Sequence, residues 1–181
     1  QSGDELSGTN VSVTSRDAAG NSTTRTLTGT VTIDTVAPTV AITTQSSNNA
    51  TTSLAKAGDT ITATFTSTDP VTAATIGGHT ATVTAGASNT YTASYTVQSG
   101  DELSGTNVSV TSRDAAGNST TQTLPGVVTI DTVVPNAPAA LADAAKNGAG
   151  YVNNALQTVT GSAEAGSIVT IYDTNGTAVL G

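Results

Sequence analysis

The sequence QSGDELSGTNVSVTSRDAAGNSTTRTLTGTVTIDTVAP at residues 1–38 recurs almost unchanged at residues 98–135. The copies differ at Arg25/Gln122, Thr28/Pro125, Thr30/Val127 and Ala37/Val134. Such a constant spacing is typical of a tandem array, and because the first copy lacks the front of its own unit, we expect the chain to be cut from a longer protein. The near-identity favours a spacer or display module, whose value lies in being repeated, over a catalytic domain.

Threonine alternates with Val, Ile, Ala or Tyr along much of the chain. A period of two predicts strands with one inward and one outward face, and β-branched Thr suits the outward face. Strands are predicted at residues 39–44, 59–67, 71–76, 79–84, 90–97, 107–112 and 119–130, with Gly, Asn, Ser and Pro turns between them. The side chains predicted to point inward are Ile61, Ala63, Phe65, Tyr91, Ala93, Tyr95, Val97, Val108, Val110, Val128 and Ile130. The pattern predicts an all-β fold of tandem immunoglobulin-like antiparallel β-sandwiches.

The strand pattern divides the chain into three parts. We expect residues 1–34 to be the last two strands of one sandwich, residues 35–134 to be a complete sandwich, and residues 135–181 to be the first half of a different module. In that module, strands are predicted at residues 155–161 and 166–173, with a turn at residues 173–176. Incomplete sandwiches expose edges and apolar faces. We therefore expect contacts with neighbouring repeats of the same polypeptide and weak head-to-tail contacts between half-domains of separate molecules.

The composition argues against several classes of function. Thirteen acidic residues against five basic ones give a net charge of −8. Such a surface repels nucleic acid and anionic lipid and attracts divalent cations. Without cysteine, neither disulfides nor thiolate chemistry is available, so an exported domain needs another cross-link, for which a metal ion is the obvious choice. The sequence shows no signal peptide and no apolar stretch of membrane-spanning length, so no membrane insertion is expected.

Motifs at the predicted strand ends resemble those of bacterial immunoglobulin-like repeats. They are Ile33-Asp34-Thr35-Val36-Ala37-Pro38 with Ile130-Asp131-Thr132-Val133-Val134-Pro135, Asp17-Ala18-Ala19-Gly20-Asn21 with Asp114-Ala115-Ala116-Gly117-Asn118, and residues 89–95. Residues 159–167 resemble a second subtype of such repeats. These repeats form the extender regions of large RTX adhesins that Gram-negative bacteria export by type I secretion. The resemblance implies an extracellular, non-enzymatic segment of the bacterial surface. It also implies calcium at the domain junctions and a role in cell adhesion and biofilms, with a distal adhesive region projected from the cell.

The acidic residues are predicted to meet at the two ends of the sandwich. In such a fold the loops after the second and sixth strands lie where the chain enters, and the loops after the first and fifth strands lie where it leaves. The incoming junction is predicted to contain Asp4, Glu5, Asp34, Asp69, Asp114 and Asn118. The outgoing junction is predicted to contain Asp101, Glu102 and Asp131, with Glu164 from the tail. Clustered carboxylates repel unless a cation joins them, and a set made only of oxygens suits Ca²⁺ better than zinc.

Other interpretations of these residues stay open. A single Asp or Asn in a loop is more often a turn former than a metal ligand. His79 is predicted to be a surface or partly packed side chain, and without a second histidine or a cysteine we expect no enzyme. The alternative function is a ligand-binding adhesion module that grips a sugar or protein with its end loops. That function would need an outward cluster of Tyr, Trp or Arg at one end.

Overall fold

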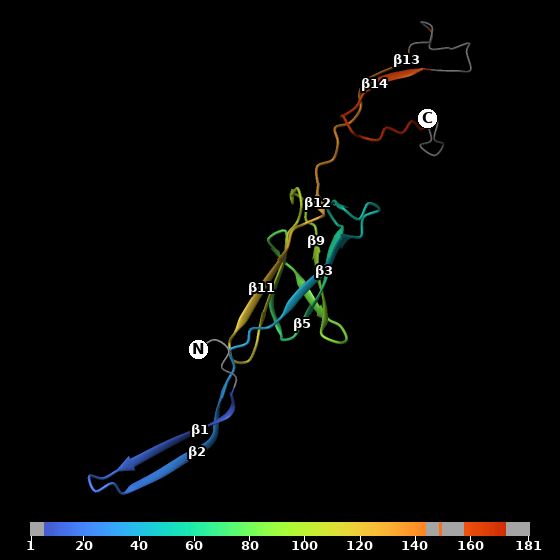
Figure 1. Cartoon of the computed structure of the whole chain (residues 1–181). Coiled ribbons are helices and arrows are strands. Elements are labelled where there is room, and N and C mark those ends of the chain that lie inside the picture. Colours follow the sequence, from blue (N-terminus) through green and yellow to red (C-terminus); the bar gives the residue numbers. More distant parts are fainter. Residues whose placement is uncertain (1–5, 144–148, 150–157, 173–181) are drawn as a thin grey trace. The chain divides into compact units, whose positions relative to one another are not determined.

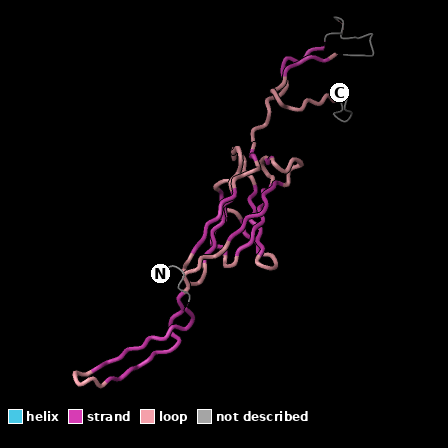
Figure 2. The backbone as a smooth tube through the Cα atoms, in the orientation of Figure 1, coloured by secondary structure: helices cyan, strands magenta, loops and turns pink. Residues whose placement is uncertain are grey.

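The computed structural model describes residues 6–143, 149 and 158–172. Strands and loops make up this part of the chain, and it contains no helix (Figures 1 and 2). None of the described segments is therefore a helix that could cross a membrane. The chain groups into two compact units, Gln1–Thr132 and Val133–Gly181.

Two four-stranded sheets form a β-sandwich in the first unit (Figure 1). One sheet has the order β3-β5-β9-β8, built from Val40–Ser47, Thr60–Ser67, Thr90–Thr96 and Thr82–Ala85. The other has the order β11-β10-β6-β7, built from Ser119–Leu124, Val108–Arg113, Val71–Ile76 and His79–Thr80. All pairings in both sheets are antiparallel. The predicted all-β sandwich is therefore confirmed, with the strand order of an immunoglobulin-like fold.

The core between the sheets follows the alternation in the sequence. In β5 the apolar residues Ile61, Ala63 and Phe65 are buried, whereas Thr64 and Thr66 face solvent. Burial of apolar surface contributes about 25 cal/mol per Å² and is the main stabilising term in such a domain. The largest fully buried apolar side chains are Phe65, Ile61, Ile76, Ile130, Val97, Val108, Val110 and Val128.

Tyr91 and Tyr95, predicted to point inward, are only partly buried at the margin of the core. The Tyr91 ring stacks on Phe65 with ring centroids 5.5 Å apart. The Tyr95 hydroxyl instead reaches a carboxylate in the loop that follows β9. A phenol keeps its polar tip hydrated or hydrogen-bonded, which holds both side chains at the edge of the core.

The predicted strand at residues 79–84 is two strands in different sheets. β7 returns from β6 through Gly77 and Gly78, whose φ values of 60° and 84° favour glycine. The chain then crosses at Ala81, whose N–H donates to Ala74 O (2.9 Å), and β8 pairs with β9 in the opposite sheet. Continuous alternation in the sequence conceals this switch.

The predicted strand at residues 119–130 is also interrupted. β11 ends before Pro125, which has no N–H to donate to a ladder. At Gly126 the backbones cross so closely that a Cβ there would lie 2.0 Å from the carbonyl oxygen of Thr106. The strand resumes as β12 (Thr129–Ile130), which pairs in parallel with β4 (Leu54–Ala55), a strand that the sequence did not indicate.

The first copy of the repeat forms a two-stranded antiparallel hairpin. It consists of β1 (Leu6–Arg16) and β2 (Ser22–Ile33). Here the second strand continues without a break, because threonine stands at position 28 where the other copy has proline. The hairpin is the counterpart of β10 and β11 in the sandwich.

The second unit contains a small antiparallel sheet. It is formed by β13 (Ala139–Asp143) and β14 (Val159–Ser162). The second predicted strand is wrong over its described part, since residues 166–171 lie outside any strand. Residue 172 forms a single β-bridge. The start of the first predicted strand and the predicted turn lie outside the described residues.

Candidate functional site: the linkers and the end loops

The incoming linker is tied to the loop between β10 and β11. Asn118 donates from Nδ2 to the carbonyl oxygen of Asp34, 2.9 Å away. The Asp114 carboxylate holds Asn118 in place, because Oδ1 accepts from the backbone N–H of Asn118 and Oδ2 accepts from its Nδ2, both at 2.8 Å. Gly117, with φ 103°, donates its N–H to Asp114 Oδ1 at 2.7 Å. The structure thus brings Asp34, Asp114 and Asn118 together.

The loop between β5 and β6 lies at the same end of the sandwich. Thr39, just before β3, exchanges hydrogen bonds with Thr68 through Thr39 N–H to Thr68 Oγ1 (3.0 Å) and Thr68 N–H to Thr39 O (3.1 Å). The buried Ser112 hydroxyl donates to the carbonyl oxygen of Asp69 at 2.9 Å. The Asp69 carboxylate accepts from Thr68 Oγ1 at 2.8 Å. This end therefore joins the linker to both predicted loops.

The carboxylate, amide and carbonyl oxygens at the incoming end are the types of ligand that a hard cation such as Ca²⁺ binds. The Asp114 carboxylate is ionised: burial opposes its charge, but hydrogen bonds from Asn118 and Gly117 outweigh burial and lower its pKa. In the described part of the chain, however, no three Asp, Glu or His side chains lie close enough to hold a metal ion. Asp4 and Glu5, predicted to complete this set, lie outside the described residues.

The outgoing linker is also fixed to the sandwich. Glu102 Oε1 accepts from the backbone N–H and the hydroxyl of Thr132, both at 2.6 Å. Thr132 Oγ1 accepts from Gly100 N–H at 3.1 Å. One residue earlier, the N–H of Asp131 donates to the carbonyl oxygen of Ala55 at 2.9 Å. Glu102 therefore lies at the outgoing end, bonded to the residue that follows Asp131.

Asp101 has a different role from its neighbour. Its Oδ2 accepts from the Tyr95 hydroxyl at 2.6 Å and from Gln98 N–H at 2.8 Å. His79 lies flat on the Tyr95 ring, 4.6 Å between centroids, and its Nε2 is 3.5 Å from Asp101 Oδ1. The Tyr95 hydrogen bond, followed by that from Gln98, lowers the Asp101 pKa. With its side chain only 11% exposed, Asp101 holds the loop after β9 against β7.

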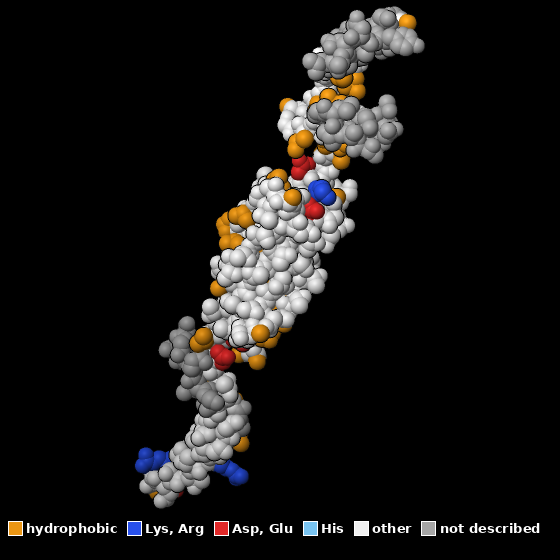
Figure 3. Space-filling model, turned by 90° about the vertical axis from the view of Figure 1, so that its right-hand side faces the viewer, with side chains coloured by type: hydrophobic (Ala, Val, Ile, Leu, Met, Phe, Trp, Pro, Cys, Tyr) orange, Lys and Arg blue, Asp and Glu red, His pale blue; other side chains and the backbone are white. Residues whose placement is uncertain are grey.

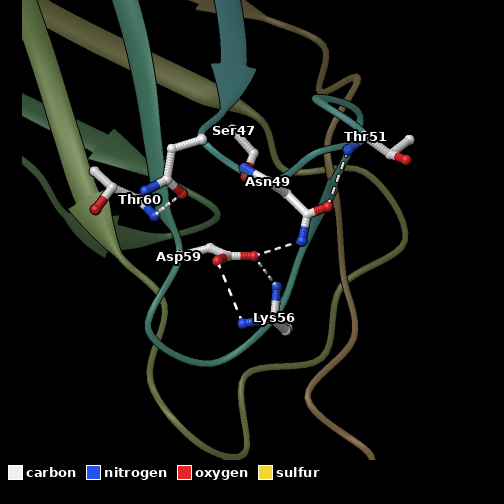
Figure 4. Close-up of polar contacts among 7 residues, drawn as sticks. Ser47, Asn49, Thr51, Lys56, Asp59 and Thr60 are labelled. Carbon is white, nitrogen blue, oxygen red and sulfur yellow. Dashed lines mark hydrogen bonds and ion pairs between the residues drawn. The ribbon is translucent and has the colours of Figure 1, made fainter. Parts of the chain in front are cut away.

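The loop between β3 and β5 is organised around Asp59 (Figure 4). Asp59 Oδ2 accepts from Asn49 Nδ2 at 2.7 Å and from Lys56 N–H at 2.9 Å. Lys56 Nζ lies 3.7 Å from Asp59 Oδ1. The Asn49 hydrogen bond, then that from Lys56, lowers the Asp59 pKa. Because this loop carries β4, whose Ala55 contacts the outgoing linker, Asp59 supports the linker indirectly. The only feature of the sequence that could have indicated this role is the position of Asp59 at the start of a predicted strand.

The acidic side chains in view in Figure 3 lie at the ends of the sandwich rather than along its side. No outward cluster of aromatic and arginine side chains is found at either end among the residues that the structure describes. Arg113 folds back on its own loop, with Nε donating to Gly117 O at 3.2 Å. His79 is partly packed, as predicted, with a side chain that is 41% exposed. The side chains of residues 6–143 and 158–172 thus do not supply the cluster that the ligand-binding alternative requires.

The Tyr95 phenol provides a test of the outgoing loop. Partial burial, then the hydrogen bond and negative charge of Asp101, raise the pKa of Tyr95 to about 12. Because the neutral phenol is favoured in the fold, this contact stabilises the sandwich below the unfolded pKa of about 10 and stops doing so as the pH rises through about 12. The test is the difference in tyrosinate absorbance between the wild type and Tyr95→Phe, both in chelator, as the pH is raised. This difference is expected to appear with a midpoint near pH 12. A midpoint near pH 10, the pKa of an unfolded tyrosine, would contradict the contact.

Comparison with family models, curated proteins and solved structures returned no match.

Proposed function

We propose that this chain is a non-enzymatic structural segment of a bacterial surface adhesin. Its sandwich acts as a rod element that holds its neighbours at a set distance and angle, so that a distal adhesive region projects from the cell. The proposal places the chain outside the cell. It gives the chain neighbouring immunoglobulin-like repeats of the same polypeptide as its partners.

The observation that carries this proposal is the fixing of both linkers. The incoming linker is bonded through Asp34 O to Asn118, and the outgoing linker through Thr132 to Glu102. Each contact joins a linker backbone group to a loop that is itself held by side-chain hydrogen bonds. A flexible tether would need neither contact, whereas a spacer that transmits orientation needs both.

Calcium at the incoming junction is part of the proposal. The residues that would hold it there are Asp34, Asp69, Asp114 and Asn118, with Asp4 and Glu5. Asp and Asn oxygens are the donors that Ca²⁺ selects, and the ion would cancel the repulsion among the carboxylates. The chain has no cysteine and one histidine, so sites built on sulfur or several imidazoles are ruled out by composition. The residues that would hold an ion at the outgoing junction are Asp101, Glu102 and Asp131. As at the incoming junction, carboxylates there also accept hydrogen bonds from the protein.

Thermal melting of the intact chain tests the calcium site. Extracellular calcium modules commonly have dissociation constants on the order of 10⁻⁴–10⁻³ M. When the free calcium concentration is about 100 times the dissociation constant, one site stabilises the fold by about 2.7 kcal/mol. We expect the melting temperature to rise in millimolar calcium and to rise less in equal magnesium. Asp114→Ala should remove the calcium response, whereas Asp17→Ala, at the equivalent position of the β1–β2 hairpin, should keep most of it.

Small-angle scattering tests the mechanical part of the proposal. Calcium should narrow the distribution of interatomic distances in the wild type and should do so less in Asp34→Ala. If the melting temperature does not change with calcium, the proposed calcium site at the incoming junction is ruled out. Identical scattering profiles with a preserved melting response would instead show that the ion stabilises the fold without stiffening the linker.

A further inference from the structure

The β1–β2 hairpin exposes an apolar face that its second copy buries. Val11 and Val13 are 47% and 66% exposed, and Leu27 and Val31 are 62% and 51% exposed. Side chains of β1 and β2, including Val11, Val13 and Leu27, line a shallow hollow on this face. The equivalents in the sandwich are Val108, Val110, Leu124 and Val128; Leu124 is partly buried and the three valines are fully buried.

The two hairpins have the same pairing and the same turn. Val11 pairs with Leu27 and Arg16 with Ser22, as Val108 pairs with Leu124 and Arg113 with Ser119. The turn hydrogen bonds also coincide. Asp17 accepts from Asn21 N–H and Nδ2 at 2.8 Å each, as Asp114 does from Asn118, and Arg16 Nε donates to Gly20 O at 3.1 Å, as Arg113 does to Gly117 O at 3.2 Å.

The four sequence differences spare this face. In the second copy, Gln122 and Pro125 are exposed, and Val127 and Val134 are 62% and 81% exposed. Replacing them by the residues of the first copy therefore leaves the buried apolar side chains unchanged, although Thr28 lets β2 continue where β11 ends before Pro125. The apolar residues that enter the core are identical in the two copies.

The sandwich itself shows what covers such a face. β10 pairs along its edge with β6, and its inward valines pack in the same core as Ile61 and Phe65 of β5. A polar contact adds specificity, because Gln45 of β3 donates from Nε2 to Thr106 O (2.7 Å) and accepts from Val127 N–H (3.1 Å). Gln45 also donates to the Thr106 hydroxyl at 2.6 Å. The equivalent positions in the first copy are Thr9, which keeps this hydroxyl, and Thr30, which supplies the same backbone N–H.

We propose that the apolar face of the β1–β2 hairpin is a docking surface for the strands at residues 40–97 of a second copy whose own β10–β11 hairpin is not docked. The hairpin then takes the place of β10 and β11 and completes a sandwich between two molecules. Because the hairpins present the same apolar face and share their register from Val11 to Arg16 and from Val108 to Arg113, the same core contacts form in either arrangement. An undocked face of this kind is an edge and an apolar surface that recruits strands of matching pattern.

Complementation between intact chains tests the proposal. The acceptor is the full chain with Val11→Asp, Val13→Asp, Val108→Asp and Val110→Asp, so that neither of its hairpins can dock. The donor is the wild-type chain, and the control donor carries only Val11→Asp and Val13→Asp, which leave its own sandwich intact. The measurements are the mass of the complex by sedimentation and the amide exchange of β5 and β9 in isotope-labelled acceptor.

With the wild-type donor, a one-to-one complex is expected in which acceptor exchange slows by about 100-fold or more. The control donor should leave the acceptor unprotected. A second comparison uses two variants without any donor. The variant with only Val108→Asp and Val110→Asp keeps an intact β1–β2 hairpin, so its β5 amides should be protected by docking between copies. The fourfold variant has no intact hairpin, so its β5 amides should stay unprotected. Failure of the wild type to bind, equal binding by both donors, or equal exchange in the second comparison would each overturn the proposal.

Discussion

Val110→Asp is expected to unfold the sandwich, whereas Val13→Asp is expected to leave its stability almost unchanged. The two valines occupy the same position of the repeat, but Val110 is fully buried and Val13 is 66% exposed. A carboxylate at the buried position has no cation or donor to compensate it and costs on the order of 5 kcal/mol. Domains of this size are stable by only about 5–15 kcal/mol. At the exposed position the change should stay within about 0.5 kcal/mol.

Urea denaturation followed by circular dichroism, with hydrogen exchange of the β5 amides, measures both variants. Exchange is the decisive signal, because β5 belongs only to the sandwich. Loss of β5 protection in Val110→Asp and its retention in Val13→Asp is the expected pair of results. If both variants lost protection equally, the two hairpins would share one folding unit, and the β1–β2 hairpin would not be available to dock elsewhere.

The sequence predicted strands accurately where one face of the strand is buried in the core and the other faces solvent. The predicted strand at residues 71–76 coincides with β6, and the one at residues 59–67 begins one residue before β5. In β5 apolar residues alternate with threonine, and in β6 the alternate residues Ala74 and Ile76 are the buried ones. Period-two patterning then determines both the type of element and the side that is buried.

The parts that the sequence could not give depend on contacts between distant residues. The alternation at residues 79–84 does not reveal that the chain changes sheets at Ala81. Two-residue strands such as β4 and β12 carry no periodicity and form only because they lie side by side. For the end loops, fold topology placed Asp34 near Asn118 and Glu102 near the outgoing linker. The choice of partners, such as Tyr95 for Asp101, follows from side-chain reach that a sequence does not show.

Gln45→Leu is expected to destabilise the sandwich by about 3 kcal/mol, although leucine nearly matches glutamine in size. Gln45, only 9% exposed, donates from Nε2 to the carbonyl oxygen and hydroxyl of Thr106 and accepts from Val127 N–H. Leucine would leave the carbonyl oxygen and hydroxyl of the fully buried Thr106 without that partner, and a buried polar group that loses its hydrogen bond costs about 1–3 kcal/mol. Gln122→Leu makes the same chemical change on an exposed strand and should shift the free energy of unfolding by less than about 0.5 kcal/mol. Equal shifts in the two variants, measured by urea denaturation, would show that this contact does not hold β3 to the β10–β11 hairpin.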